Sequence, residues 1–235
     1  MNDPGEPSGR KYRPASERVR LRRRPARADY DPAAVREVFD EALMCHVGYT
    51  IDAVPYVMPM LHIRVGDRLY LHGSAANRTL ETVASGAPIC AEATLLDGLV
   101  MGRSAFENSV NYRSVIAFGH GSPVDDVDAK RDILIALLGR LLPPGRLEEV
   151  RPLAPRELAR TKVVELVLEE CSVKVRNGPA GDGEQDLDAP VWAGEIPFGS
   201  VMGPPVHDGK RPWTGDAPAY LDGWAGPPNR RAGTP

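Results

Sequence analysis

The chain has 235 residues, of which 42% are hydrophobic and 26% are charged, and its formal net charge at pH 7 is −3. This composition predicts a soluble protein with one substantial core of about 150 to 170 residues, and the small net charge argues against a protein that binds polyanions over its whole surface. No apolar run approaches the roughly 18 residues of a transmembrane helix. The N-terminus also lacks the apolar stretch of a signal peptide. We therefore expect a cytoplasmic protein with no membrane partner.

The three cysteines, Cys45, Cys90 and Cys171, are widely spaced and lie among apolar residues. Buried thiols in a reducing compartment are the simplest interpretation. No Cys-x-x-Cys pair is present, and a site built on His62 and His72 would lack a third ligand nearby in the sequence. We predict no metal site.

Both ends of the chain are predicted to be disordered tails. Residues 1–28 carry nine basic and three acidic residues and few core-forming ones. A solvated tail is favoured over nucleic-acid binding, because aromatic residues are not interleaved with the arginines. Residues 203–235 contain seven prolines and six glycines, a composition that does not support a packed element. The expected organisation is a basic tail over 1–29, a folded domain over 30–202 and a Pro/Gly-rich tail over 203–235.

The first predicted element is a helix that begins at Pro32 and is capped by Asp31. Strands follow, joined by tight turns at Asp52-Ala53 and Gly66-Asp67. They span 45–51, 55–65 and 68–72. The later predicted elements are a short helix over 79–86, strands over 88–102 and 108–120, a helix after Asp126, a short helix over 155–159 and a long strand over 162–176. About six strands at hairpin spacing, with three or four helices, favour an α+β protein with a closed or split antiparallel barrel.

An anion-binding turn is predicted over residues 69–78. The strand Leu-Tyr-Leu-His runs into Gly73-Ser74, and a helix then begins with Asn77 and Arg78 in its first turn. A helix start offers free backbone N–H groups, and an arginine adds a bidentate cationic partner for phosphate. The lysine of a nucleoside-triphosphate loop is missing. The turn is therefore expected to hold a phosphate that is not transferred.

This order of segments resembles the flavin-nucleotide-binding branch of the pyridoxamine 5′-phosphate oxidase-like family, which includes nitroimidazole-resistance proteins. The resemblance covers roughly residues 32–202 and is strongest at His72–Arg78, with further similarity at 112–119 and 191–197. It implies a six-stranded antiparallel split barrel that dimerises and binds flavin mononucleotide (FMN) between the subunits. The Arg-x-x-x-Leu-Lys and Ser-Arg-Lys motifs of the true oxidase are missing, and Asn77-Arg78-Thr79 stands in place of the second. Vitamin B6 chemistry is therefore not expected.

The residues expected to hold FMN come from four segments. An edge strand can offer backbone groups to the polar edge of the flavin ring, and the turn can offer the phosphate contacts. The resemblance adds residues around 112–114 and near 192, from the same chain or its partner. The expected contacts are Met58, Pro59, Met60, Leu61, His72, Gly73, Ser74, Asn77, Arg78, Tyr112, Ser114 and Trp192, with Arg113 beside them.

The sequence contains no Gly-x-Ser-x-Gly, His-Glu-x-x-His or Gly-x-Gly-x-x-Gly motif. A flavoprotein needs none of them, because the cofactor carries the electrons and the protein supplies position and electrostatics. The resemblance implies an oxidoreductase acting on a small molecule. The alternative is a non-catalytic flavin- or haem-binding protein on the same barrel. We expect a homodimer whose cofactor site needs both chains, because a small split barrel leaves strand edges and an apolar face to be covered.

Overall fold

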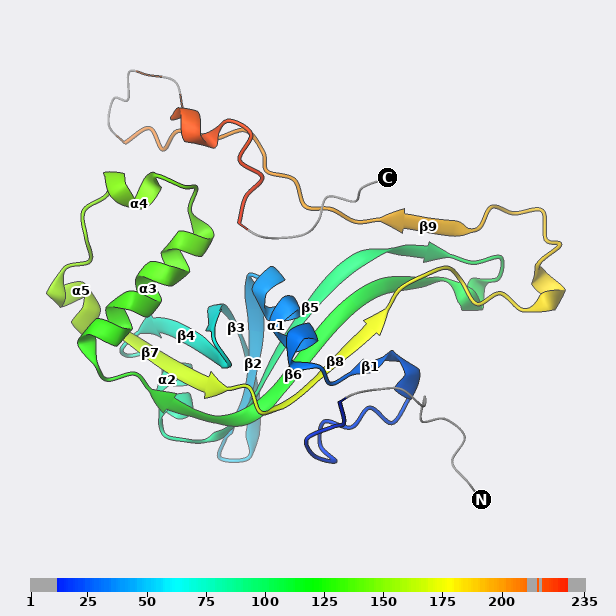
Figure 1. The fold of residues 1–235 in the computed structure, drawn as a ribbon, viewed down its shortest axis with the longest axis horizontal. Helices are drawn as coiled ribbons and strands as arrows, with labels where there is room; N and C mark the ends of the chain where they lie inside the picture. Colours follow the sequence, from blue (N-terminus) through cyan, green and yellow to red (C-terminus); the bar gives the residue numbers. More distant parts are fainter. Residues whose placement is uncertain (1–11, 211–214, 216, 228–235) are drawn as a thin grey trace.

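The computed structural model describes residues 12–210, 215 and 217–227, and its centre is an antiparallel sheet that closes on itself (Figure 1). Six strands form the closed ring, in the spatial order β2–β3–β4–β7–β6–β5. Their bounds are Met44–Ile51 (β2), Val54–Val65 (β3), Arg68–Ser74 (β4), Pro88–Met101 (β5), Ser109–Pro123 (β6) and Thr161–Val167 (β7). The predicted six-stranded antiparallel barrel is confirmed.

Three further strands extend this ring: β1 (Ala28–Asp29), β8 (Glu170–Arg176) and β9 (Gly194–Pro197). β8 pairs with β6, β1 with β8, and β9 with β5.

The prediction of one long strand over 162–176 was wrong, because the chain is interrupted between β7 and β8. Both strands pair with β6, but their registers differ by one residue: Gly121 faces Leu166, whereas Phe118 faces Glu170. At the interruption, the Leu168 N–H donates to the carbonyl of Asp67. An extra residue of this kind bends the strand and ends one ladder before the next begins.

Two helices pack against the core of the barrel, and each begins at a side-chain cap, of which the one at Asp31 was predicted. The Asp31 side chain accepts from the Ala33 N–H at 2.8 Å and starts α1 (Pro32–Glu41). The Asn77 side chain accepts from the Leu80 N–H and starts α2 (Arg78–Ala84). α1 contributes Val35, Val38 and Phe39 to the main core, and α2 contributes Leu80 and Val83.

Strand alternation divides the barrel wall into an inner and an outer face. The inner face is apolar and fully buried at Cys45, Val47, Leu69, Ala91 and Ala117. Cys45 and Cys171 are buried as expected, and burial raises the pKa of each thiol to about 12. All three cysteines are free.

Two helices lie over the outer face of β4 and β7: α3 (Val127–Leu141) and α5 (Pro155–Ala159). The short helix α4 (Arg146–Glu149) lies between them in the chain. Leu134 of α3 and Leu158 of α5 pack on Val163, and Tyr70 lies against this cluster. Asp126 caps α3 as predicted, by accepting from the Ala129 N–H at 2.7 Å. Among the described residues, no helix is long and apolar enough to cross a membrane.

The far ends of β5 and β6, with the segment around 177–193 and β9, extend beyond the barrel as an arm (Figure 1). The arm also contains two 3₁₀ turns, Ala105–Glu107 and Glu184–Asp186. Polar contacts hold its layers together: the Asn111 amide donates to Glu195 at 2.5 Å, and Arg176 donates to the other side of the same amide.

The described part of the expected N-terminal tail, 12–29, packs against the barrel, so the expectation of a solvated tail does not hold there. Val19 is 3% exposed, and Arg18 lies over the Phe118 ring, 4.7 Å from its centre. A short 3₁₀ turn at Pro25–Arg27 leads into β1. The buried Val19 and the pairing of β1 with β8 anchor this segment. Its many arginines had favoured the prediction of an unstructured tail. The first part of that tail, 1–11, lies outside the described residues.

The expected C-terminal tail is described over 203–210, 215 and 217–227 and is mostly exposed. One 3₁₀ turn, Ala219–Leu221, carries Tyr220, whose hydroxyl donates to Glu149 at 2.8 Å. Trp213 and 228–235 lie outside the described residues.

Candidate functional site

Strand register sorts the expected flavin contacts onto the two faces of the barrel wall. Residues directly opposite one another in an antiparallel pair share a face. Pro59 is opposite His46, His46 is opposite Glu92, and Thr94 is opposite Ser114. By this register the outer face carries Pro59, Leu61, His72, Tyr112 and Ser114. Met58 and Met60 belong to the inner face, where Met60 is buried and Met58, near the rim, is 40% exposed.

A polar row that the sequence analysis missed lies between these contacts on the outer face. The Nδ1 atom of His46 is 3.3 Å from a carboxylate oxygen of Glu92, and the Thr94 hydroxyl donates to the same carboxylate. The signal was present in the alternation of β2, where His46, Gly48 and Thr50 alternate with apolar residues. The row places an imidazole next to a carboxylate on the outer face, a pair of residue types that can serve as proton donor and acceptor.

The turn between β4 and α2 uses its own backbone donors. The Ala76 N–H donates to the Ser74 hydroxyl oxygen at 3.3 Å, and the Asn77 N–H donates to the Ser74 carbonyl at 2.9 Å. Two of the backbone N–H groups at this helix start are thus engaged within the turn. The charged group at this turn that can bind a phosphate is the side chain of Arg78.

The Arg78 guanidinium lies over the ring of Tyr56, 4.7 Å from its centre. The Tyr56 ring in turn stacks on Tyr49, with centres 5.5 Å apart and planes 14° from parallel. The Tyr49 hydroxyl is 2.9 Å from the Thr79 hydroxyl in a buried pair. No carboxylate pairs with Arg78 among the described residues, whereas other barrel arginines do form such pairs, among them Arg36, Arg64, Arg68 and Arg113. A planar guanidinium without a carboxylate can take a phosphate in bidentate fashion.

Arg113 does not line the outer face, contrary to the expectation that placed it beside Tyr112 and Ser114. Its guanidinium donates to Asp97 at 2.8 Å and to Glu41 of α1 at 2.9 Å. Hydrogen bonds to these two carboxylates raise the pKa of Arg113 above its usual value. The alternation that puts 112 and 114 on the outer face turns Arg113 away from it.

His72 is half-buried on the outer face of β4, opposite Val163 of β7. Burial lowers its pKa, so the ring is neutral at pH 7. No hydrogen bond reaches this ring from the described residues, while the other four histidines have partners: His46 with Glu92, His62 with Phe39, His120 with Gly86 and His207 with Gly209. A neutral imidazole with a free ring nitrogen is a ready metal ligand.

His62 and His72 do not form a shared site, because they lie on opposite faces of the wall. His62 is directly opposite Leu71, so the next residue, His72, points the other way. Within the described residues, no group of three or more His, Cys, Asp or Glu side chains could hold a metal ion.

Trp192 lies on the arm, just before β9, and is 64% exposed. Its ring packs over the backbone of Gly194, where an added Cβ would meet ring atoms at 2.7 Å. A place for Trp192 in the core is thereby excluded. Its contact with a flavin or a partner chain remains a prediction.

Residues 31–175 match the sequence model of the family described as pyridoxamine 5′-phosphate oxidase. No curated protein sequence matches the chain. Among solved structures, the flavocytochrome Anf3 from Azotobacter vinelandii is 35% identical, with a TM-score of 0.81 over 89% of this chain and 97% of its own. The FAD and heme binding protein from Mycobacterium smegmatis is 32% identical, with a TM-score of 0.79 over 87% of this chain and 100% of its own. A proposed 5-nitroimidazole antibiotic resistance protein from Bacteroides thetaiotaomicron shares the fold, at 21% identity and a TM-score of 0.54 over 63% of this chain and 86% of its own.

Proposed function

Because the chain belongs to the pyridoxamine 5′-phosphate oxidase family, we propose that it binds a flavin nucleotide and works as an electron-transfer protein of the flavocytochrome type. The observation that carries the flavin part is Arg78, an exposed guanidinium that is held by an aromatic ring and paired with no carboxylate among the described residues. Such a group binds a phosphate without first breaking an ion pair.

The flavin would lie along the outer face. Arg78 and Ser74 would hold its phosphate, while Pro59 and Leu61 of β3 would meet the ring with Tyr112 and Ser114 of β6. The sequence-based expectation is FMN. The Mycobacterium protein, which is 32% identical and matched over its full length, is an FAD and heme binding protein. That similarity favours FAD over FMN for this chain.

His72 is the residue that we propose as the haem ligand. Its neutral, half-buried ring lacks a hydrogen-bond partner in the described part of the chain, and the apolar cluster of Leu134, Leu158 and Val163 lies on the same face. Histidine is the commonest protein ligand of haem iron, and an apolar surrounding suits the porphyrin. The bound flavin and haem would carry the electrons, and this chain would supply their position and environment.

The test is to identify what the protein binds. We expect absorption bands of both flavin and haem in the purified protein, and mass spectrometry of the released ligands should find FAD. His72→Ala should lose the haem band and keep the flavin, whereas the control His120→Ala should keep both. A protein that stays colourless after incubation with FAD, FMN and haemin would contradict the proposal.

A catalysed reaction on a small molecule is the second candidate, and the His46–Glu92 pair favours it, because a redox reaction at a flavin needs a proton donor or acceptor. Oxidation of a reduced nicotinamide or deazaflavin by the flavin-loaded protein would establish an oxidoreductase. Loss of that turnover in His46→Ala, with flavin still bound, would assign the pair to the reaction. Flavin binding without such turnover would mean that the protein transfers electrons without catalysing a reaction on a small molecule.

We also propose that the protein is a homodimer with a shared cofactor site. Large apolar side chains are exposed on the barrel wall and on the arm, among them Val57, Leu96, Leu99, Phe106 and Trp192. A second copy of the chain would cover part of this apolar surface. Sedimentation of the flavin-loaded protein should give a dimer, and Phe106→Ser with Trp192→Ser should weaken it. The control is Val206→Ser, a change at an exposed residue in the C-terminal region. A monomer with full flavin occupancy would contradict the shared site.

A further inference from the structure

We infer that Tyr56 is a positioning residue for the flavin phosphate, because the Arg78 guanidinium is held over its ring. Tyr56 would act through Arg78 and would not itself touch the phosphate. The inference rests on the proposed flavin site and adds to it the residue that sets phosphate affinity.

The support for Arg78 is a continuous column of side chains that begins in the core. Thr79 and Tyr49 are 2% and 5% exposed, and their hydroxyl groups form a hydrogen bond of 2.9 Å. Tyr49 is directly opposite Tyr56 in the β2–β3 pair, and their rings stack. One face of Tyr56 is thus fixed by a buried neighbour, and Arg78 lies over the ring.

This arrangement holds an arginine in place without neutralising it. Arg64 is held by the carboxylate of Asp40, which engages its donors and cancels its charge. A ring face attracts the guanidinium through the π system and leaves the N–H groups at the edge of the plane free. The ligand class that such an edge recognises is a planar or tetrahedral oxyanion. On the proposed site, that anion is the monophosphate of FMN or the pyrophosphate of FAD.

Stacking should also raise affinity by reducing the entropy that Arg78 loses on binding. A free arginine side chain samples many rotamers, and binding must select one. The Tyr56 ring selects among them before the ligand arrives. Removing the ring should therefore weaken phosphate binding by about two- to fivefold, the order expected for one exposed cation–π contact.

The experiment is a fluorescence titration of the apoprotein with FMN, FAD and riboflavin, which has no phosphate. Tyr56→Leu should weaken FMN and FAD binding by about two- to fivefold and leave riboflavin binding unchanged. Tyr56→Phe keeps the ring and should bind all three ligands as the wild type does. In an Arg78→Ala background, Tyr56→Leu should have no further effect. Tyr220→Leu, far along the chain, is the control for a lost tyrosine.

The outcomes separate the inference from the function on which it rests. If Arg78→Ala leaves FMN and FAD affinity unchanged, the proposed phosphate site is wrong. If Arg78→Ala weakens both but Tyr56→Leu does not, the site stands and the role of Tyr56 is overturned. Equal weakening of riboflavin by Tyr56→Leu would also overturn it, because the ring would then act by direct contact or through the fold. Should Tyr56→Leu fail to fold, Tyr56→Ile, with a side chain suited to a strand, replaces it.

Discussion

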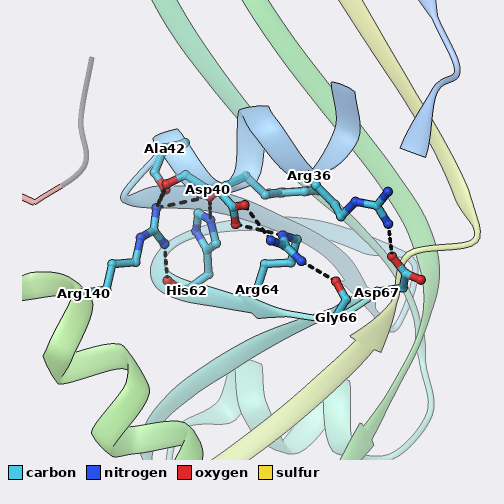
Figure 2. Close-up of polar contacts among 9 residues, drawn as sticks. Arg36, Asp40, Ala42, His62, Arg64, Gly66, Asp67 and Arg140 are labelled. Carbon is cyan, nitrogen blue, oxygen red and sulfur yellow. Dashed lines mark hydrogen bonds and ion pairs between the residues drawn. The ribbon is translucent and has the colours of Figure 1, made fainter. Parts of the chain in front are cut away.

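The Nε2 atom of His62 lies 2.8 Å from the carbonyl oxygen of Phe39, so a side chain inside the barrel bonds to the last turn of α1 (Figure 2). The Nδ1 atom of the same ring is buried and has no hydrogen-bond partner in the part of the chain that the structure describes. The pKa of His62 is lowered from 6.5 to about 4, mainly by burial, and the Phe39 carbonyl and Asp40 offset part of this lowering while the nearby Arg140 adds to it. The ring is therefore neutral, and Nε2–H donates to Phe39.

This pairing predicts that acid destabilises the fold through His62. The folded-state pKa of about 4 lies below the ordinary 6.5, so the unfolded chain takes up a proton that the folded chain excludes. The contribution is intact above pH 6.5 and is lost as the pH falls toward 4, by about 3 kcal/mol at most. Urea denaturation between pH 7 and 4 should show a flatter pH dependence for His62→Gln than for the wild type. His120→Gln, at an exposed histidine, should keep the wild-type profile. A wild-type profile in His62→Gln would assign the acid sensitivity to other groups.

Arg140 ties α3 to the barrel through backbone carbonyls alone (Figure 2). Its guanidinium donates to the carbonyl oxygens of Asp40 and Ala42 at 2.6 Å, of His62 at 2.9 Å and of Phe39 at 3.2 Å. The carbonyls at the end of a helix have no partner within the helix, and a cation there also interacts favourably with the helix dipole.

Arg140→Met should therefore lower the free energy of unfolding by about 2–4 kcal/mol, since it leaves partly buried carbonyls without a donor. The matched control on the same helix is Arg131→Met, which breaks only an exposed pair with Asp128 and should cost less than about 0.5 kcal/mol. Urea denaturation of both variants at pH 7 gives the comparison. Equal losses would show that Arg140 contributes no more than a surface arginine.

Local chemistry was enough to predict most of the elements. The predicted cap Asp31 begins its helix, and the turn at Asp52-Ala53 forms with both residues at positive φ, 49° and 62°. The element that was predicted wrongly, the single strand over 162–176, depends on pairing between distant segments. The break between β7 and β8 follows from the register along β6, to which the local sequence of 162–176 gives no clue.

The site shows the same division between local and distant information. Arg78 was found from a short motif, because its position at the start of α2 is local. Tyr49 and Tyr56 meet only through the β2–β3 register, and Arg113 meets Glu41 across 72 positions of sequence. The local sequence of 112–114 cannot show which of its side chains will pair with a carboxylate that is distant in the sequence.

Substitutions at Arg113 and at Arg78 should consequently have opposite effects: one should change the free energy of unfolding and the other the flavin affinity. Arg113→Leu leaves Glu41 and Asp97 without their cation, and the free energy of unfolding should fall by about 2–4 kcal/mol. Its flavin affinity should match the wild type, since the side chain faces away from the outer face. Arg78→Ala should do the reverse and weaken flavin binding by roughly ten- to a hundredfold at unchanged stability. Denaturation and flavin titration on the same preparations decide the matter, and weaker flavin binding in Arg113→Leu at full stability would restore Arg113 to the site.

The arm depends on a buried carboxylate, Asp182, whose side chain is 4% exposed. It accepts from the Arg103 backbone N–H at 2.8 Å and from the Arg103 guanidinium at 3.0 Å, and so fixes the segment after β8 to the end of β5. Asp182→Asn keeps the shape of the side chain but loses its charge and weakens the contact with Arg103. The equilibrium constant for local opening of the arm should therefore rise about tenfold. Limited proteolysis should then cut faster between 177 and 193 while the barrel resists. Asp188→Asn, at an exposed position in the same segment, should be cut at the wild-type rate. If the two variants are cut equally fast, the arm is held by its strand pairing, and the Arg103–Asp182 pair adds nothing to it.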